Sequence, residues 1–574
     1  MNISSEGKRA VLSFQDFSFQ YRSQAEPTLQ HISLTIYEGE KVLIVGPSGS
    51  GKSTIAHCIN GLVPHFYPGE QSGSATILGK ELSSLSIFEL SGMVGTVLQD
   101  PDGQFVGLTV AEDIAFKMEN DGVPQAEMAA RVAEAARAVD IDTHLEASPH
   151  FLSGGQKQRT TLAGVLVSDV DILLFDEPLA NLDPLSGKTA IELIDRIHRE
   201  TRKTVVIVEH RLEEVLHRSV DRIIVIGEGR IVADTTPKEL LSSELLRSMG
   251  IREPLYLTAL KYADCVITPE MNPQNVAGLA IEPCIGPLRA WYDSLPAAQR
   301  PSSKQAVLEL RDISFSYDDG KPILRGVSFQ VGEGEMISIV GRNGAGKSTL
   351  SKLICGFHKP TSGQIIYKGR SLDNDSIKER AQCIGFVMQN PNHMISKTLI
   401  FEEVALGLRV RGVPEDEVKD RVYEALKVCG LYPFREWPIS ALSFGQKKRV
   451  TIASILVLNP EVIILDEPTA GQDFKHYNEM MEFLLSLKAR GVSIIVITHD
   501  MHLMLEYAER SIVIVDGAVK ADDRPADVLA HADIVEAANL TDTSVYSLAV
   551  RAGIGQPREF VHRFIQQDRR ERAR

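Results

Sequence analysis

The sequence has few cysteines, and their spacing predicts neither a cross-link nor a metal centre. Six cysteines are scattered over 574 residues, and no two of them form a C-x-x-C pair: Cys58, Cys265, Cys284, Cys355, Cys383 and Cys429. A zinc site or a disulfide framework needs closely paired ligands or a cysteine-dense chain. We therefore expect free thiols in a reducing cytosol.

Long apolar runs and an excess of positive charge are also missing. No apolar run approaches the roughly eighteen residues that a membrane span needs, and residues 1–8 are not followed by the apolar segment of a signal peptide. The formal net charge is −15, which argues against electrostatic binding of nucleic acid. We expect a soluble protein without a nucleic-acid partner.

The sequence does contain a long internal repeat. A glycine-rich stretch at residues 46–53 recurs at residues 341–348, a shift of 295. Further positions recur at a shift of 290, and a histidine recurs at 289: Gln99/Gln389, Ser153/Ser443, Glu177/Glu467, Asp183/Asp473 and His210/His499. So nearly constant a shift indicates a duplication. Tyr256 and Tyr546, also 290 apart, indicate that each repeat has a small C-terminal appendage.

Both glycine-rich stretches match the pattern G-x-x-x-x-G-K-Ser/Thr of a phosphate-binding loop. Each follows a short apolar run, 41–45 or 336–340, as a strand–loop–helix unit requires. Backbone N–H groups in such a loop point at phosphate oxygens, and the helix N-terminus adds partial positive charge. We predict that nucleotide phosphates bind to Gly46, Pro47, Ser48, Gly49, Ser50, Gly51, Lys52, Ser53 and Thr54, and to Gly341, Arg342, Asn343, Gly344, Ala345, Gly346, Lys347, Ser348 and Thr349.

Two acidic pairs follow apolar runs further along each repeat. Asp176 and Asp466 end these runs, where a carboxylate can hold Mg²⁺ together with Ser53 or Ser348. Glu177 and Glu467 come next. Strand alternation predicts that they point to the opposite side, where each can polarise the attacking water as a general base.

The remaining patterns predict an α/β fold with inserted helices. The apolar runs at 171–175, 204–208, 462–465 and 493–497 lack polar alternation, as do strands of a parallel sheet covered by helices. An Ala- and Glu-rich stretch at 126–137, preceded by a capping box at 109–112, predicts a helical lobe inserted into each core. Seven prolines between 250 and 305 indicate an appendage and a linker.

These patterns divide the chain into four segments. We predict a nucleotide-binding domain at 1–245, an appendage and Pro-rich linker at 246–304, a second nucleotide-binding domain at 305–540, and a C-terminal appendage with a basic tail at 541–574. We expect the end of the tail, 567–574, to be solvated and frayed.

Residues 152–156 and 442–446, Leu-Ser-Gly-Gly-Gln and Leu-Ser-Phe-Gly-Gln, resemble the signature motif of the ABC ATPases. With the glycine loops and acidic pairs, this resemblance covers nearly the whole chain except the linker and tail. It implies tandem P-loop ABC ATPase domains, each a RecA-like α/β core with an antiparallel β lobe and an inserted helical lobe. The implied reaction is ATP hydrolysis coupled to transport across a membrane, with ATP and Mg²⁺ as cofactors.

The resemblance also implies roles for single residues. Tyr21 and Tyr317 would stack on adenine, Gln99 and Gln389 would sense Mg²⁺ and water, and His210 and His499 would contact the γ-phosphate. The signature residues would act on the nucleotide of the opposite domain, so the two domains would pair within the chain: Ser153, Gly154, Gly155 and Gln156 on one side, and Ser443, Phe444, Gly445 and Gln446 on the other.

The two composite sites are not expected to be equivalent. Site one would join Lys52, Gln99, Glu177 and His210 with the second signature, and site two would join Lys347, Gln389, Glu467 and His499 with the first. Phe444 stands where the first signature has Gly154, a position at which close backbone approach favours glycine. The stretches 179–183 and 469–473 also differ. We expect site two to hydrolyse ATP faster, although both sites bind it.

Two further segments resemble the energy-coupling-factor (ECF) ATPases, which import vitamins and transition metals. These are the acidic and Gln-containing stretch 100–105 after the first glutamine, and the Pro-led stretch 246–260. This likeness implies an importer of a vitamin, a vitamin precursor such as hydroxymethylpyrimidine or thiamine, or a metal ion such as cobalt. Its partners would be an integral membrane coupling subunit and a substrate-binding subunit, with the chain at the cytoplasmic face of the membrane.

Two alternatives stay open from the sequence. One is the fused ATPase of a peptide ABC importer. The other is a soluble ABC-F protein that acts on ribosomes, although the linker lacks the long basic helix of that class and neither repeat has its Asn-His sequence.

Overall fold

The computed structural model describes residues 8–99, 103–180, 182–298, 304–317, 320–470 and 472–572. It divides into two compact units, Met1–Trp291 and Tyr292–Arg574. Part of the stretch 100–105, together with Asn181 and Gly471 of the loops after the acidic pairs, lies outside the described residues.

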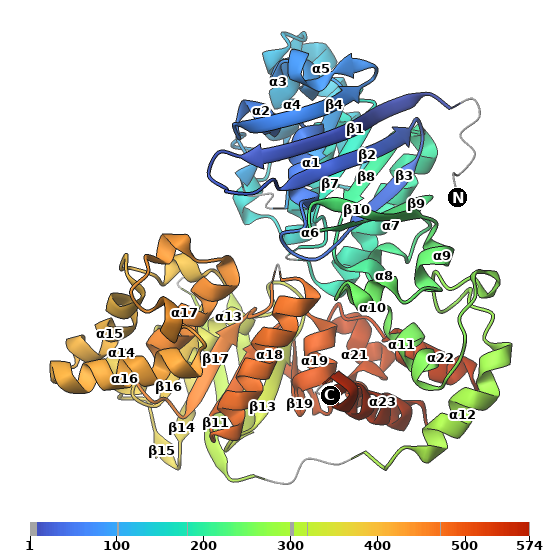
Figure 1. Cartoon of the computed structure of the whole chain (residues 1–574). Helices are drawn as coiled ribbons and strands as arrows, with labels where there is room; N and C mark the ends of the chain where they lie inside the picture. Colours follow the sequence, from blue (N-terminus) through green and yellow to red (C-terminus); the bar gives the residue numbers. More distant parts are fainter. Residues whose placement is uncertain are drawn as a thin grey trace. The chain divides into compact units, whose positions relative to one another are not determined.

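The first unit alternates strands and helices along the chain (Figure 1). Its strands are β1 (Ala10–Tyr21), β2 (Leu29–Tyr37), β3 (Lys41–Val45), β4 (Gly69–Ile77), β5 (Lys80–Glu81), β6 (Val94–Val97), β7 (Ile172–Asp176), β8 (Thr204–Val208), β9 (Arg222–Gly227) and β10 (Arg230–Thr235). Its helices are α1 (Lys52–Ile59), α2 (Leu62–His65), α3 (Ile87–Ser91), α4 (Val110–Asn120), α5 (Gln125–Ala138), α6 (Gly154–Leu166), α7 (Pro184–Thr201), α8 (Leu212–Val215), α9 (Pro237–Leu241), α10 (Leu245–Ser248), α11 (Leu255–Tyr262) and α12 (Ile285–Ser294), the last crossing the boundary between the units.

A mostly parallel sheet forms the core of this unit, in the order β10-β9-β3-β8-β7-β6. The strands β3, β7 and β8 are buried along their whole length, and they pair in parallel with their neighbours. Strands that are apolar on both faces must be covered by helices on both sides. The prediction of a parallel α/β core is confirmed, with its strand bounds correct to within one residue.

A second, antiparallel sheet has the order β2-β1-β4-β5. Its apolar side chains share one core with those of the parallel sheet and of α1, which places the antiparallel lobe against the glycine loop. The helices α3, α4 and α5 gather at one end of the unit (Figure 1). Thr109 and Glu112 form the predicted capping box at the start of α4.

The second unit repeats this architecture with the sheet orders β12-β11-β14-β15 and β16-β17-β18-β13-β19-β20. Its strands are β11 (Ala306–Ser316), β12 (Pro322–Gly332), β13 (Met336–Val340), β14 (Ser362–Tyr367), β15 (Arg370–Ser371), β16 (Ile384–Val387), β17 (Val462–Asp466), β18 (Ser493–Ile497), β19 (Arg510–Val515) and β20 (Ala518–Asp523). Its helices are α13 (Lys347–Ile354), α14 (Ile377–Arg380), α15 (Ile400–Val410), α16 (Glu415–Val428), α17 (Phe444–Leu456), α18 (Phe474–Ala489), α19 (Met501–Tyr507), α20 (Pro525–Leu529), α21 (Ala532–Ala537), α22 (Ser544–Arg551) and α23 (Pro557–Arg572).

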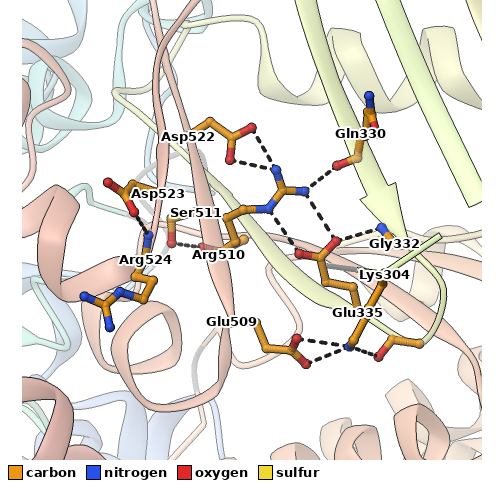
Figure 2. Close-up of polar contacts among 12 residues, drawn as sticks. Lys304, Gln330, Gly332, Glu335, Glu509, Arg510, Ser511, Asp522, Asp523 and Arg524 are labelled. Atoms are coloured by element: carbon orange, nitrogen blue, oxygen red, sulfur yellow. Dashed lines mark hydrogen bonds and ion pairs between the residues drawn. The ribbon is translucent and has the colours of Figure 1, made fainter. Parts of the chain in front are cut away.

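One arginine in each unit ties the antiparallel lobe to the core sheet. Figure 2 shows Arg510 at the start of β19, where its guanidinium reaches Asp522 on β20 and Glu335 before β13 at 2.8–3.3 Å, and also the carbonyl of Gln330 on β12. In the first unit Arg222 donates in the same way to Asp234, Glu40 and the Thr35 carbonyl. The duplication has therefore kept a structural ion-pair network as well as the nucleotide-binding motifs.

The C-terminal helix corrects one expectation. The tail does not fray before Arg572, because α23 continues to that residue and packs on α19. Arg572 donates to Glu506 on α19 at 3.0 Å and to Asn478 on α18 at 3.2 Å, and pairs with Asp568. The charged sequence suggested a solvated end, but the hydrogen bond from Arg572 to the buried carboxylate of Glu506 keeps the end of α23 in place.

Replacing Arg222 with alanine is expected to lower the stability of the first unit by about 3–5 kcal/mol, because it leaves Glu40 buried without its cation. The side chains of Arg222 and Glu40 are 8% and 6% exposed. Urea unfolding of the full chain measures this. Arg230→Ala, which removes an exposed arginine eight residues away on the adjacent strand, should change stability by less than about 0.5 kcal/mol. Equal effects of the two substitutions would contradict the assignment.

Candidate functional site

The two glycine loops have the geometry of an anion-binding turn. In each, a fully buried strand, β3 or β13, leads through the loop into a helix that begins at Lys52 or Lys347. A Cβ on Gly46 would lie 2.2 Å from the Ile226 carbonyl oxygen, and Gly51 has φ +103°, so both positions need glycine. No described side chain caps α1 or α13, and the N-terminus of a helix attracts anions.

The lysines of the loops fold back over them. The Nζ of Lys52 donates to the carbonyls of Gly46 and Pro47, both at 2.8 Å. Lys347 does the same with Gly341 at 2.6 Å and Arg342 at 3.0 Å. The remaining predicted loop residues, Ser48 to Ser50 and Asn343 to Ala345, lie between strand and helix in both units. Each ammonium group is thus held against the first two residues of its glycine loop, where phosphates are predicted to bind.

Asp176 and Asp466 end the buried strands β7 and β17 beside these loops. Burial, together with the charge of the adjacent glutamate, raises the pKa of each carboxyl to about 6. Asp176 Oδ1 is buried and has no hydrogen-bond partner among the described residues, and the Ser348 hydroxyl hydrogen-bonds to Asp466. A buried carboxylate beside a serine hydroxyl provides the oxygen ligands that Mg²⁺ prefers.

Glu177 and Glu467 correct the reasoning from strand alternation. Both residues have left the strand and adopt left-handed backbone conformations, with φ +49° and +46°. Their N–H groups donate to the carbonyls of Val208 and Ile497 at 2.8 and 2.9 Å, which ties them to β8 and β18. A non-glycine residue with positive φ is strained, and such strain is concentrated at functional sites.

The predicted glutamine and histidine contacts differ between the units. In the first, Gln99 Nε2 donates to Glu177 Oε2 at 2.7 Å, while His210 Nδ1 is 3.9 Å from Glu177 Oε1. In the second, His499 Nδ1 lies 2.7 Å from Glu467 Oε1. Gln389 follows β16, as Gln99 follows β6.

This difference changes the electrostatics of the two glutamates. Burial raises the pKa of Glu177, and Glu209 contributes in the same direction, whereas His210 opposes it. Burial also pushes the pKa of Glu467 upward, but the ion pair with His499 outweighs it, so the pKa lies below its ordinary value.

The tyrosines lie at the first turn of the helix after each glycine loop. Tyr21 Oη is 3.1 Å from Thr54 Oγ1, and Tyr317 Oη is 3.3 Å from Thr349 Oγ1. Tyr317 is 40% exposed. Both rings therefore border the loop from the antiparallel lobe, as an adenine-stacking role requires.

The signature motifs form the N-termini of α6 and α17. Ser153 and Gln156 make a reciprocal capping box, and Ser443 and Gln446 make the same one. Gly154 and Phe444 are the first helical residues, followed by Gly155 and Gly445. Phe444 is 44% exposed, has no left-handed backbone, and its ring lies 5.9 Å from Lys448 Nζ. Within its own unit the phenylalanine is therefore accommodated without strain.

Sequence reasoning missed the supporting hydrogen bonds of four residues. Gln158 and Lys448, one turn into the signature helices, donate to the carbonyls of Pro178 and Glu467 at 2.6 and 2.5 Å. Gln104 bonds to the backbone at both Thr96 and Leu98, so it fixes the loop that carries Gln99. Glu209 holds the backbone beside His210. A search for chemically unlike pairs at the repeat shift would have found Gln158/Lys448 and Glu209/Thr498.

Lys448 gives a pH test of this support. Burial lowers its pKa to about 8, although Glu467 and Asp466 oppose the shift. Below pH 8 the lysine is charged in folded and unfolded states, so the cost of burying its charge is fully present. Between pH 8 and its ordinary pKa of 10.5, the folded state loses the proton first, so stability rises with pH.

We expect the stability of the wild type relative to Lys448→Gln, the residue of the first repeat, to increase by on the order of 2–3 kcal/mol between pH 8 and 10. Urea unfolding in EDTA at several pH values measures the difference. Lys447→Gln, at the neighbouring half-buried position, serves as the control and should show no such trend. A pH-independent difference for Lys448→Gln would contradict the prediction.

Residues 29–180 and 324–470 match the family model described as ABC transporter, and residues 243–315 match one described as ATP-binding cassette cobalt transporter. An ABC transporter ATP-binding protein of Clostridium perfringens is 59% identical over 98% of this chain and 99% of its own length. One of Enterococcus faecalis is 57% identical over 98% of this chain and all of its own length.

Among solved structures, cbiO1 from Clostridium perfringens, described as part of the ABC transporter complex cbiONQ, is 35% identical. It covers 41% of this chain and 94% of its own, with a TM-score of 0.38. The two matched segments of the ABC transporter model contain both glycine loops, both signatures and both acidic pairs. The chain therefore belongs to the ABC transporter ATP-binding proteins, with two ABC ATPase domains in one polypeptide.

Proposed function

We propose that this protein is the ATP-binding and hydrolysing subunit that energises an ECF-type importer of a vitamin, a vitamin precursor or a metal ion. The observation that carries the proposal is the match of residues 243–315 to the cobalt-transporter model. That segment includes α11 with its leading Pro254, the appendage that distinguishes the ECF type in the sequence. This match favours the ECF type over a peptide importer or a ribosome-associated ATPase.

The partners we propose are an integral membrane coupling subunit and a substrate-binding subunit, with this chain at the cytoplasmic face of the membrane. Within the described ranges, no helix is both long and apolar enough to span a bilayer. An ATPase without a membrane span of its own must pass its motion to a partner that has one. No nucleic acid takes part.

An exposed apolar patch on the first unit supports a membrane-protein partner. Its members lie on or beside α2, α3 and α4 and are 43–81% exposed: Phe66, Ile87, Phe88, Val106, Leu108 and Phe116. His65 bonds to the Leu85 carbonyl, and Lys117 lies 5.8 Å from the Phe88 ring, so the three segments are neighbours. A grouping of large exposed apolar side chains marks an interaction surface. Val106 directly follows residues 103–105, part of the stretch 100–105 that resembles the ECF ATPases and that we propose contacts the membrane partner.

We further propose that ATP binds at composite sites, in which the signature of one domain completes the glycine loop of the other. The N-termini of α1 and α13 bind the β- and γ-phosphates, with Lys52 or Lys347 neutralising their charge. Ser53 and Asp176, or Ser348 and Asp466, together with Gln99 or Gln389, would hold Mg²⁺, which would supply charge neutralisation of the phosphates. Tyr21 and Tyr317 border the adenine.

The protein side chains then prepare the attacking water. Glu177 or Glu467 accepts its proton, because each carboxylate stands directly after the metal-binding aspartate. His210 or His499 contacts the γ-phosphate, and the serine and glycines of the opposite signature complete the donors around it. The two halves must close for each turnover, and closure is the motion transmitted to the partner.

The two glutamates should contribute unequally to turnover. Phe444 replaces a signature glycine in site one only, so we expect Glu467→Gln to reduce ATP turnover about tenfold or more and Glu177→Gln to reduce it less than about threefold. Steady-state phosphate release from the full chain measures both. Glu127→Gln, an exposed glutamate on α5, is the charge-matched control. The reverse order of the two effects would contradict the ranking.

The partner is tested by isolating the chain from membranes and identifying the integral membrane proteins and the small molecule that accompany it. We expect Phe88→Asp with Leu108→Asp to reduce the co-isolated membrane subunits at least about tenfold, because two charges are placed in an apolar contact. ATP binding by the chain itself should persist. Val266→Asp, an 80% exposed apolar site on the same unit, should have no effect. Co-isolation of ribosomes without membrane subunits would overturn the proposed function.

A further inference from the structure

Glu209 is a buried carboxylate that the proposed reaction does not use. It directly precedes His210, whereas Thr498 precedes His499 in the second repeat. Its side chain is fully buried at the end of β8. A buried carboxylate is costly unless several donors satisfy it, so its partners indicate what it does.

Glu209 accepts hydrogen bonds from two loops of the first unit. Its Oε1 accepts from the N–H groups of His210 at 2.8 Å and Arg211 at 3.2 Å. Its Oε2 accepts from the N–H of Leu179 at 3.1 Å. The carboxylate therefore joins the loop that carries His210 to the loop that follows Glu177.

The same carboxylate lies closest to the histidine ring. His210 Nδ1 is 3.2 Å from Glu209 Oε1 but 3.9 Å from Glu177 Oε1. Glu177 instead accepts from Gln99 at 2.7 Å. In the first unit, one carboxylate stands by the histidine and a different one stands by the glutamine.

In the second unit a single residue takes the histidine contacts. Glu467 Oε1 accepts from the His499 N–H at 3.1 Å and lies 2.7 Å from His499 Nδ1. Its Oε2 accepts from the Thr498 hydroxyl at 3.2 Å. The candidate base of this unit thus also anchors its own histidine loop.

We infer that Glu209 is a positioning residue that orients His210 in place of Glu177, so that the base and the histidine anchor are separate residues in the first domain and one residue in the second. This inference rests on the proposed function, because the role of Glu177 and Glu467 as general bases comes from that proposal. A carboxylate at Nδ1 fixes that nitrogen as the donor and turns Nε2 outward, as in other histidine–carboxylate pairs. The hydrogen bonds themselves do not depend on the reaction.

The first experiment measures amide hydrogen exchange in the full chain without nucleotide. Glu467→Gln should accelerate exchange at 498–500 at least about tenfold, because the His499 N–H loses a charged acceptor. Glu177→Gln should leave exchange at 209–211 unchanged within about twofold, because Glu209 still holds that loop. Acceleration at 209–211 by Glu177→Gln alone would overturn the inference.

A second comparison exchanges Glu209 for the residue of the other repeat and asks whether the effect of Glu177→Gln then changes. Glu209→Thr gives the first unit the residue of the second, so Glu177 should take over His210. In that background, Glu177→Gln should now accelerate exchange at 209–211, as Glu467→Gln does at 498–500. If Glu177→Gln is silent in the Glu209→Thr background as well, the inference fails. Glu214→Gln, which removes the same charge from the nearby helix α8, is the control.

The second experiment measures turnover of the chain with its co-isolated membrane subunits, in the Glu467→Gln background that leaves site one active. Glu209→Ala should lower kcat about tenfold with KM unchanged within twofold, the size typical of losing a residue that orients a functional side chain. Glu209→Thr should restore kcat to within about threefold, because Thr498 already serves the second unit.

An unchanged kcat in Glu209→Ala, or a loss that appears only in KM, would overturn the positioning role. Thermal unfolding of each variant separates this from misfolding. If no membrane subunit is found but the exchange results hold, the proposed transport function fails and the inference about Glu209 stands.

Discussion

The structure depends on carboxylates placed at the ends of strands that are buried on both faces. β7 and β17 leave the core at Asp176 and Asp466, where burial raises the pKa of each carboxyl to about 6. The next residue must turn sharply, and it does so in a strained left-handed conformation. The glycine loop, the glutamine loop and the histidine loop all meet this point, because the carboxyl ends of parallel strands lie at one edge of a sheet. The candidate site residues therefore gather at the ends of buried strands, where an unpaired charge is costly.

The duplication shows which parts of this arrangement are fixed and which can vary. The loop lysines make equivalent backbone contacts in both units, and the signature capping boxes are the same. The positions beneath them differ: Gln158 against Lys448, Glu209 against Thr498. The lysines, acidic pairs, glutamines and histidines of our proposal are the same in both units, whereas these supporting side chains have diverged.

The sequence was sufficient to predict the residues whose chemistry is local. The glycine loops with their strands and helices follow from spacing and composition, and the signature motifs follow from the resemblance of residues 152–156 and 442–446 to those of ABC ATPases. Other features depend on distant parts of the chain. Glu177, which has a positive φ, donates its N–H to the Val208 carbonyl, and Glu209 accepts from the N–H of Leu179, thirty residues earlier. The order of the C-terminal residues depends on Glu506, an acceptor buried on another helix. No local pattern encodes these contacts.

The last of these contacts has a practical consequence. Arg572 connects Asn478, in the second turn of α18, to Glu506 on α19. α18 begins directly after Asp473, and α19 begins two residues after His499. An affinity tag or fluorescent fusion attached immediately after α23 would therefore disturb a side chain that contacts the helices following Asp473 and His499. A purification tag should be placed elsewhere on the polypeptide.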